Sequence, residues 1–175
     1  NLIHGLPVFC VSVALVDGDT PILGVVFDPN RDECFTAWKD GGAYLNGERI
    51  RCSSREELSD ALIATGFPHW DFERMPEYLE ALTGFAKGTR GLRRMGSAAI
   101  DLAYVACGRF EAFFEYSLQP WDIAAGLVLV SEAGGNISGF SGQTEPGFLL
   151  SGKEVLAASP GVFAESAEVI RSAFG

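Results

Sequence analysis

Two carboxylates, Glu115 and Asp122, lie seven residues apart where an extended segment is followed by a helical pattern. Pro120 is expected to end the extended segment, and Asp122 falls where the helix should begin. A carboxylate there can cap the N–H groups of the first turn and is favoured by the helix dipole. The small residues 124–126 would let a ligand approach, and a rigid carboxylate beside Glu115 suits a hard cation. Spacing alone leaves Asp122 open between an ordinary N-cap and a metal ligand.

A second candidate is the segment Gly96-Ser97-Ala98-Ala99, which precedes a helical pattern. A glycine and small side chains at a helix start leave backbone N–H groups accessible to an anion. The alternative is that Ser97 is a plain N-cap in a closely packed helix. Three arginines precede the segment and are interpreted as a solvated edge, with contact to an anionic ligand as the alternative: Arg90, Arg93 and Arg94.

Composition limits the classes of function. The chain has 175 residues, a formal net charge of −10 and 47% hydrophobic residues, which excludes intrinsic disorder. A sequence pI near 4.6 argues against a nucleic-acid backbone binder but permits a substrate whose negative charge is met by metal ions. The sequence contains no run of 18 apolar residues, so it predicts no membrane span, and no secretory signal is visible.

Cysteines and histidines narrow the choice of metal. The four cysteines form no CxxC motif and are interpreted as buried, reduced thiols in a reducing compartment: Cys10, Cys34, Cys52 and Cys107. Only two histidines occur, His4 and His69, which argues against a His-rich zinc site. Any metal should therefore be a hard, oxygen-bound ion such as Mg²⁺.

The positioning elements follow from periodicity. Apolar segments separated by turn residues predict an antiparallel meander of three strands at residues 8–16, 21–27 and 33–39, followed by a short stretch at 43–45. A polar stretch follows at 49–57. Beyond a predicted boundary near Leu58, strands at 60–65 and 110–115 alternate with helices at 75–86, 98–106, 123–133 and from 160 onward. Trp70 is interpreted as a packing residue. The expected fold is a layered α+β or α/β fold, with antiparallel strands in domain 1–58 and an α/β domain in 59–175.

Several motifs resemble one known family. Residues 121–126, Trp-Asp-Ile-Ala-Ala-Gly, match the WDxAAG signature of the inositol monophosphatase family, a group of lithium-sensitive, Mg²⁺-dependent phosphatases. Residues 1–7 look like the sequence just after the family's DPxDGTTN signature, and residues 42–47 resemble its GAYLNG turn. Residues 96–99 and 132–135 also fall in family order. The resemblance covers nearly the whole chain and implies the layered sugar-phosphatase fold.

The resemblance implies roles for five residues. Asp122 resembles the family's catalytic and metal-binding aspartate, which also lies against the substrate. Glu115 matches the glutamate that hydrogen-bonds the inositol ring, and Gly96, Ser97 and Ala98 correspond to the segment that lines the substrate pocket. Related 3′-nucleotide bisphosphate phosphatases usually place a different residue at the position of Glu115. The resemblance therefore favours inositol-type monophosphates.

The implied activity is Mg²⁺-dependent hydrolysis of a phosphate monoester, inositol monophosphate to inositol and phosphate. Other substrates remain open: fructose 1,6-bisphosphate, 3′-phosphoadenosine 5′-phosphate or NADP. A non-catalytic regulatory role is the rival class. The family's other metal ligands precede the position of Asn1, so this 175-residue piece alone is expected to be inactive. We also expect a cytoplasmic homodimer that acts on a small molecule and has neither a nucleic-acid nor a membrane partner.

Overall fold

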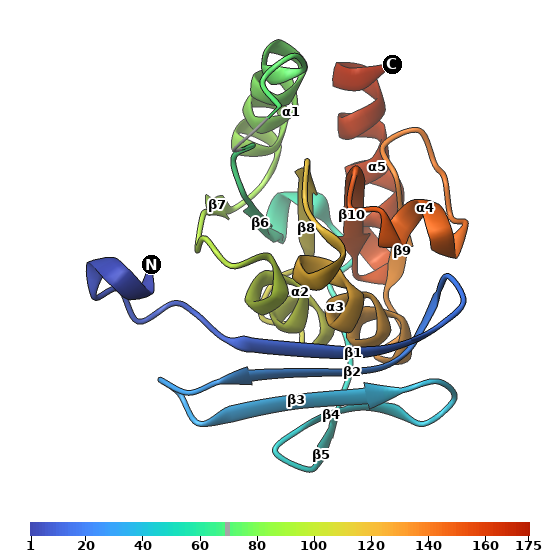
Figure 1. Cartoon of the computed structure of the whole chain (residues 1–175). Helices are drawn as coiled ribbons and strands as arrows, with labels where there is room; N and C mark the ends of the chain where they lie inside the picture. Colours follow the sequence, from blue (N-terminus) through green and yellow to red (C-terminus); the bar gives the residue numbers. More distant parts are fainter. Residues whose placement is uncertain (69–70) are drawn as a thin grey trace.

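The computed structural model describes residues 1–68 and 71–175, so His69 and Trp70, which figure in the sequence analysis, lie outside the described residues. The chain forms four layers in the order sheet, helix pair, sheet, helix pair (Figure 1). This is a mixed α+β fold with one antiparallel and one mixed sheet. The predicted fold class is thereby confirmed.

The first sheet is an antiparallel meander whose five strands follow chain order (Figure 1). Its strands are β1 (Val11–Asp17), β2 (Thr20–Asp28), β3 (Glu33–Trp38), β4 (Gly42–Leu45) and β5 (Glu48–Ile50). Three of them were predicted as strands, and β4 coincides with the short stretch expected at 43–45. The fifth, β5, overlaps the stretch interpreted as polar, and it pairs antiparallel with β4, where Arg49 lies opposite Tyr44.

The second sheet has the strand order β7-β6-β8-β10-β9 and mixes parallel and antiparallel pairs. Its strands are β6 (Leu62–Thr65), β7 (Gly91–Arg93), β8 (Ala112–Tyr116), β9 (Asn136–Ser138) and β10 (Glu154–Ala158). The parallel pairs join β6 to β7 and to β8, whereas β10 runs antiparallel to β8 and β9. The parallel register of β6 and β8 brings the ends of both strands to one edge of the sheet.

Proline decides where several helices begin. The helices are α1 (Met75–Gly88), α2 (Ala98–Ala106), α3 (Pro120–Glu132), α4 (Pro146–Leu150) and α5 (Pro160–Phe174), with short 3₁₀ turns at Leu2–His4 and Leu58–Asp60. Pro120 was expected to end the preceding segment, but it occupies the first turn of α3, where its missing N–H costs nothing. Gln119 is therefore the N-cap, and Asp122 is the third helical residue. Of the two alternatives left open for Asp122, the ordinary N-cap is therefore wrong.

The helices α2 and α3 lie between the two sheets, and their composition reflects this (Figure 1). Every residue of α2 from Ala99 to Ala106 is buried, because both sides of the helix meet protein. On the central strand β8, Phe113 belongs to the apolar core around α2 and α3, whereas Phe114 belongs to the core beside α1 and α5. Because successive side chains of β8 point to opposite faces of the sheet, the interior is divided into two cores.

The first of these cores draws on both predicted domains. Val26 and Phe35 of the first sheet pack in the same cluster as Leu129 of α3. The chain leaves the first sheet after β5 and enters the second sheet at β6. The division into domains 1–58 and 59–175 stays a prediction.

All four cysteines are free and half-buried rather than fully buried. Among the described residues, no helix combines the length and apolar character that crossing a membrane requires.

Because β2 lies close against α3, we expect position 24 to tolerate only glycine. A Cβ atom on Gly24 would lie 2.5 Å from the backbone oxygen of Ala125 and 2.8 Å from its Cα. Backbone cannot yield as a side-chain tip can, so Gly24→Ala should lower the free energy of unfolding by about 1–3 kcal/mol. Urea unfolding of the full-length protein, followed by circular dichroism, measures this change.

The matched control is Gly88→Ala at the end of α1, where an added Cβ meets nothing within 4 Å. Its stability should be unchanged or slightly raised, because alanine favours helix. Equal stabilities of the two variants would contradict the close contact between β2 and α3.

Candidate active site

A cavity of about 670 Å³ opens where α2 and α3 begin and β6 and β8 end. Ligands of open α/β sheets commonly bind beyond the carboxyl ends of parallel strands, which is the edge where this cavity lies. All five residues singled out from the sequence line it: Gly96, Ser97, Ala98, Glu115 and Asp122. The structure therefore brings these residues to one place.

Asp122 stabilises the start of α3 although it is not the N-cap. Its Oδ2 accepts a hydrogen bond from the backbone N–H of Gln119 at 2.9 Å. A carboxylate in the first turn is also favoured by the helix dipole. Asp122 is half-buried at the cavity wall, so a structural and a ligand-binding role are compatible.

Glu115 is a buried carboxylate without a hydrogen-bond donor among the described residues. It lies on β8 and is 5% exposed. Burial raises its pKa from 4.5 to about 8; the positive charge of Arg94 lowers the pKa, and the negative charge of Asp122 raises it. A buried carboxylate left without donors is costly, and a ligand that donates hydrogen bonds would relieve that cost.

Asp101 is a second buried carboxyl group near Glu115, and sequence reasoning missed it. It lies on α2, is 1% exposed, and its Oδ1 has no hydrogen-bond partner among the described residues. Burial, followed by repulsion from Glu115, raises the pKa of Asp101 well above its usual value. The available signal was an acidic residue inside an otherwise apolar helix, where unpaired charges are rare.

Arg94 is exposed, as the interpretation as a solvated edge predicts, and it also lines the cavity. Its guanidinium carbon lies 5.5 Å from the centre of the Phe67 ring. Arg90, by contrast, pairs with Asp60 at 2.7 Å on the surface. One arginine of the cluster thus contributes a positive charge to the cavity, where it offsets the two buried carboxyl groups.

Asn1 fastens the loop that leads into α2. Its side-chain amide donates to the carbonyl oxygens of Val8 at 2.7 Å and Met95 at 3.2 Å. Gly96 then takes a left-handed conformation with φ of +88°, which favours glycine. Ser97 caps α2 by its backbone only, and its Oγ lies 3.6 Å from Cys10 Sγ. Nothing in the sequence signals the long-range contacts of Asn1.

No group of three or more His, Cys, Asp or Glu side chains among the described residues is arranged as a metal site. Mg²⁺ needs an octahedral set of oxygen ligands. Asp122 offers one anionic oxygen of the kind that Mg²⁺ prefers.

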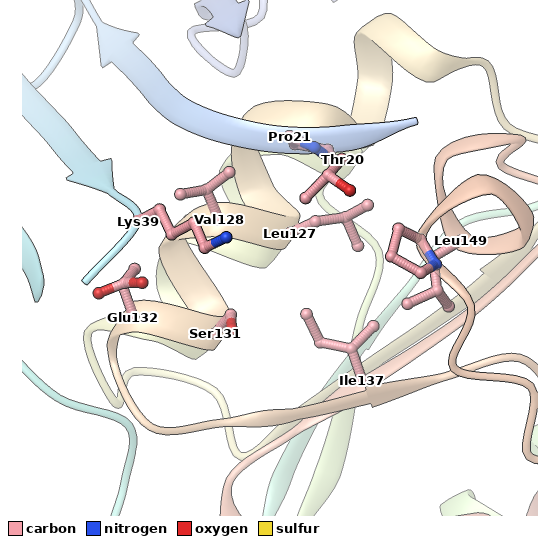
Figure 2. Close-up of a pocket in the computed structure, with 10 residues that line it drawn as sticks. Thr20, Pro21, Lys39, Leu127, Val128, Ser131, Glu132, Ile137 and Leu149 are labelled. Atoms are coloured by element: carbon pink, nitrogen blue, oxygen red, sulfur yellow. The ribbon is translucent and has the colours of Figure 1, made fainter. Parts of the chain in front are cut away.

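A smaller cavity of about 220 Å³ lies at the other end of α3 (Figure 2). Apolar side chains dominate it, and the Lys39 amine and the Glu132 carboxylate lie at one side of it (Figure 2). The Glu132 carboxylate already accepts the N–H groups of Asp40 at 2.9 Å and Gly42 at 2.8 Å. The Glu132 carboxylate therefore stabilises the turn between β3 and β4. The larger cavity is the better candidate for chemistry.

The chain is similar to known proteins of one family. The profile of the inositol monophosphatase family matches residues 1–173, and the chain belongs to this family. It is 45% identical over 170 residues to the "Putative Nus factor SuhB" of Neisseria meningitidis, covering 97% of this chain and 64% of that protein. It is 46% identical over 160 residues to the "Inositol-1-monophosphatase" of Rhizobium meliloti, covering 90% of this chain and 60% of that protein.

Solved structures show the same fold. The extragenic suppressor protein suhB from Bartonella henselae superposes with a TM-score of 0.91 at 38% identity, covering 98% of this chain and 64% of that one. The inositol monophosphatase from Anabaena gives 0.90 at 35% identity, covering 99% and 68%. The chain thus spans about two thirds or less of the length of the curated relatives named above.

The raised pKa of Glu115 predicts how stability depends on pH. Between pH 4.5 and about 8 the folded state holds a proton on Glu115 that the unfolded state has lost, so stability falls as pH rises. Glu115→Gln removes this titration. In metal-free buffer the variant should gain stability relative to the parent across that range, by at most about 1.4 kcal/mol per pH unit.

Denaturant unfolding of both proteins at several pH values checks this expectation. The surface variant Glu168→Gln serves as a control, because Glu168 forms an exposed pair with Arg171. A difference between Glu115→Gln and the parent that stays constant with pH would show that the Glu115 carboxyl is not held in a desolvated site.

Proposed function

We propose that the complete protein hydrolyses phosphate monoesters with the help of Mg²⁺, and that its substrate is an inositol monophosphate. The observation that carries the proposal is the convergence of Glu115, Asp122 and the start of α2 on one cavity. Family membership supports phosphatase chemistry in general. The substrate and the metal are inferences from the site.

Each part of the cavity has a role in this proposal. Asp122 would bind the metal and lie against the substrate. The Glu115 carboxylate lacks donors among the described residues, and hydroxyl groups of a polyol would supply them. Gly96, Ser97 and Ala98 would line the pocket at the start of α2. Bound Mg²⁺ would neutralise the phosphate and lower the pKa of a water molecule.

The partners and setting of the protein are part of the same proposal. We infer a small-molecule partner rather than a nucleic acid, because the net charge of −10 opposes contact with phosphate backbones. A cytoplasmic homodimer remains the expected assembly. Fructose 1,6-bisphosphate, 3′-phosphoadenosine 5′-phosphate and NADP form the comparison panel of substrates for an assay of the full-length protein.

A non-catalytic role is the rival function, since several relatives carry the name Nus factor SuhB. The cavity favours the hydrolase, because a regulatory surface has no need of buried, unpaired carboxyl groups. Phosphate release from inositol monophosphate, measured with and without Mg²⁺, separates the two readings. Absence of release from every substrate of the panel would favour the regulatory role.

The proposal predicts that Asp122→Asn separates folding from activity. Asparagine keeps a side-chain oxygen for the Gln119 N–H, so stability should change by well under about 1 kcal/mol. Loss of the anionic oxygen should abolish nearly all phosphatase activity and raise the Mg²⁺ concentration needed for any remainder. The assay is phosphate release over a Mg²⁺ titration of the full-length protein.

The matched control for this change is Asp60→Asn, an aspartate that pairs with Arg90 on the surface. It should keep the parental Mg²⁺ dependence. Near-normal turnover of Asp122→Asn at ordinary Mg²⁺ would refute the metal-ligand role, and its unfolding would make Asp122 chiefly structural.

Glu115→Gln tests substrate recognition. If Glu115 accepts hydroxyl hydrogen bonds, then above about pH 8, where it is ionised, the variant should lose roughly tenfold or more in turnover of inositol phosphate. A charge-assisted hydrogen bond contributes about 1.5–3 kcal/mol. Hydrolysis of an aryl phosphate, which lacks those hydroxyls, should fall much less. Steady-state kinetics with both substrates gives the ratio, and equal losses would assign Glu115 to support of the metal or the fold.

A further inference from the structure

We propose that Gly66 is a positioning residue for substrate recognition, because its missing side chain provides the space that the Glu115 carboxylate occupies at the cavity wall. This inference rests on the proposed function, in which Glu115 binds substrate hydroxyls. It adds a residue directly after β6, 49 positions earlier in the sequence, that determines where the carboxylate lies.

The space beside Gly66 is filled by the carboxylate itself. A Cβ atom built on Gly66 would lie 2.1 Å from Glu115 Oε1 and 2.2 Å from both Cδ and Oε2. Ordinary contacts begin near 3.5 Å, so the two groups cannot coexist. Gly66 has no left-handed φ angle. Backbone conformation therefore does not require glycine here, and the requirement for it is the room taken by Glu115.

The backbone at Gly66 is held and cannot retreat. The hydroxyl of Tyr78 donates to the Gly66 carbonyl oxygen, and Thr65 Oγ1 lies 3.3 Å from the same oxygen. Thr65 Oγ1 also donates to the carbonyl oxygen of Phe114 at 2.7 Å, on the residue before Glu115. Thr65 and Tyr78 are both buried. This hydrogen-bond network fixes the end of β6 against β8.

A side chain at position 66 would therefore move Glu115 and leave the backbone in place. The obstructed atoms are the far end of a flexible side chain, which can rotate at small cost to the fold. The carboxylate would leave the position from which it meets the substrate ring. Gly66 thereby acts through Glu115 on the recognition of hydroxyl groups.

The test is Gly66→Ala in the full-length protein. The kcat/KM for inositol 1-phosphate should fall roughly tenfold more than the kcat/KM for p-nitrophenyl phosphate, because only the former offers hydroxyls to Glu115. The loss should appear mainly in KM. Gly88→Ala, whose added Cβ meets nothing within 4 Å, should keep both values.

A second variant separates positioning from general damage. Glu115→Asp shortens the side chain by one methylene and so makes room for a Cβ on residue 66. Alone it should weaken recognition of inositol 1-phosphate, but combined with Gly66→Ala it should restore part of the lost kcat/KM. Equal loss on both substrates, or a double variant that only adds the two single losses, would overturn the proposal.

A crystal structure of Gly66→Ala provides a readout that does not depend on activity. The Glu115 carboxylate should move by roughly 1 Å or more, from the 2.1 Å overlap to ordinary contact. An unmoved carboxylate would overturn the inference whatever the kinetics show. If the parent protein hydrolyses neither substrate, the proposed function fails, while a displaced carboxylate would still establish the steric role of Gly66.

Discussion

The close approach of β2 to α3 is the constraint on which the rest of the structure depends. Gly24 leaves no side chain between the sheet and the backbone of Ala125, so α3 lies directly on the first sheet. On another side of the same helix, a Cβ on Gly126 would meet Leu102 of α2 at 2.4 Å. The small residues after Asp122 thus pack the two helices together between the sheets, and both helices begin at the cavity.

The same arrangement accounts for the electrostatics of the cavity. A pair of helices enclosed by two sheets removes water from the groups beside it, and burial is the largest cause of the raised pKa of both Glu115 and Asp101. Arg94 provides partial compensation from the cavity wall, where its charge lowers both pKa values. Packing therefore raises the pKa of both carboxyl groups in the protein without any ligand.

Features that depend on nearby residues in the sequence could be predicted. Alternation and turn residues located β1 to β3, and the motif residues located Glu115 and Asp122. The three-residue strand β9 and the continuous apolar stretch of β10 lack an alternating pattern, and the predicted start of α3 was wrong because Pro120 opens helices as well as ending strands. Gly66 and Asn1 could not be found, since their contacts with Glu115 and Met95 arise from strand register and loop placement far along the chain.

Under the proposed function, metal binding and substrate recognition are supported by different parts of the fold. Asp122 is carried by α3, whose position is set by the first sheet through Gly24 and Ala125. Glu115 is carried by β8, which the Thr65 hydroxyl ties to β6, while the Tyr78 hydroxyl of α1 donates to the Gly66 carbonyl oxygen just after β6. The two supports share no residue, so substitutions in the Thr65–Tyr78 network should alter which phosphate esters are accepted without disturbing the helix that holds Asp122. Substrate preference in this fold can therefore change separately from the metal chemistry.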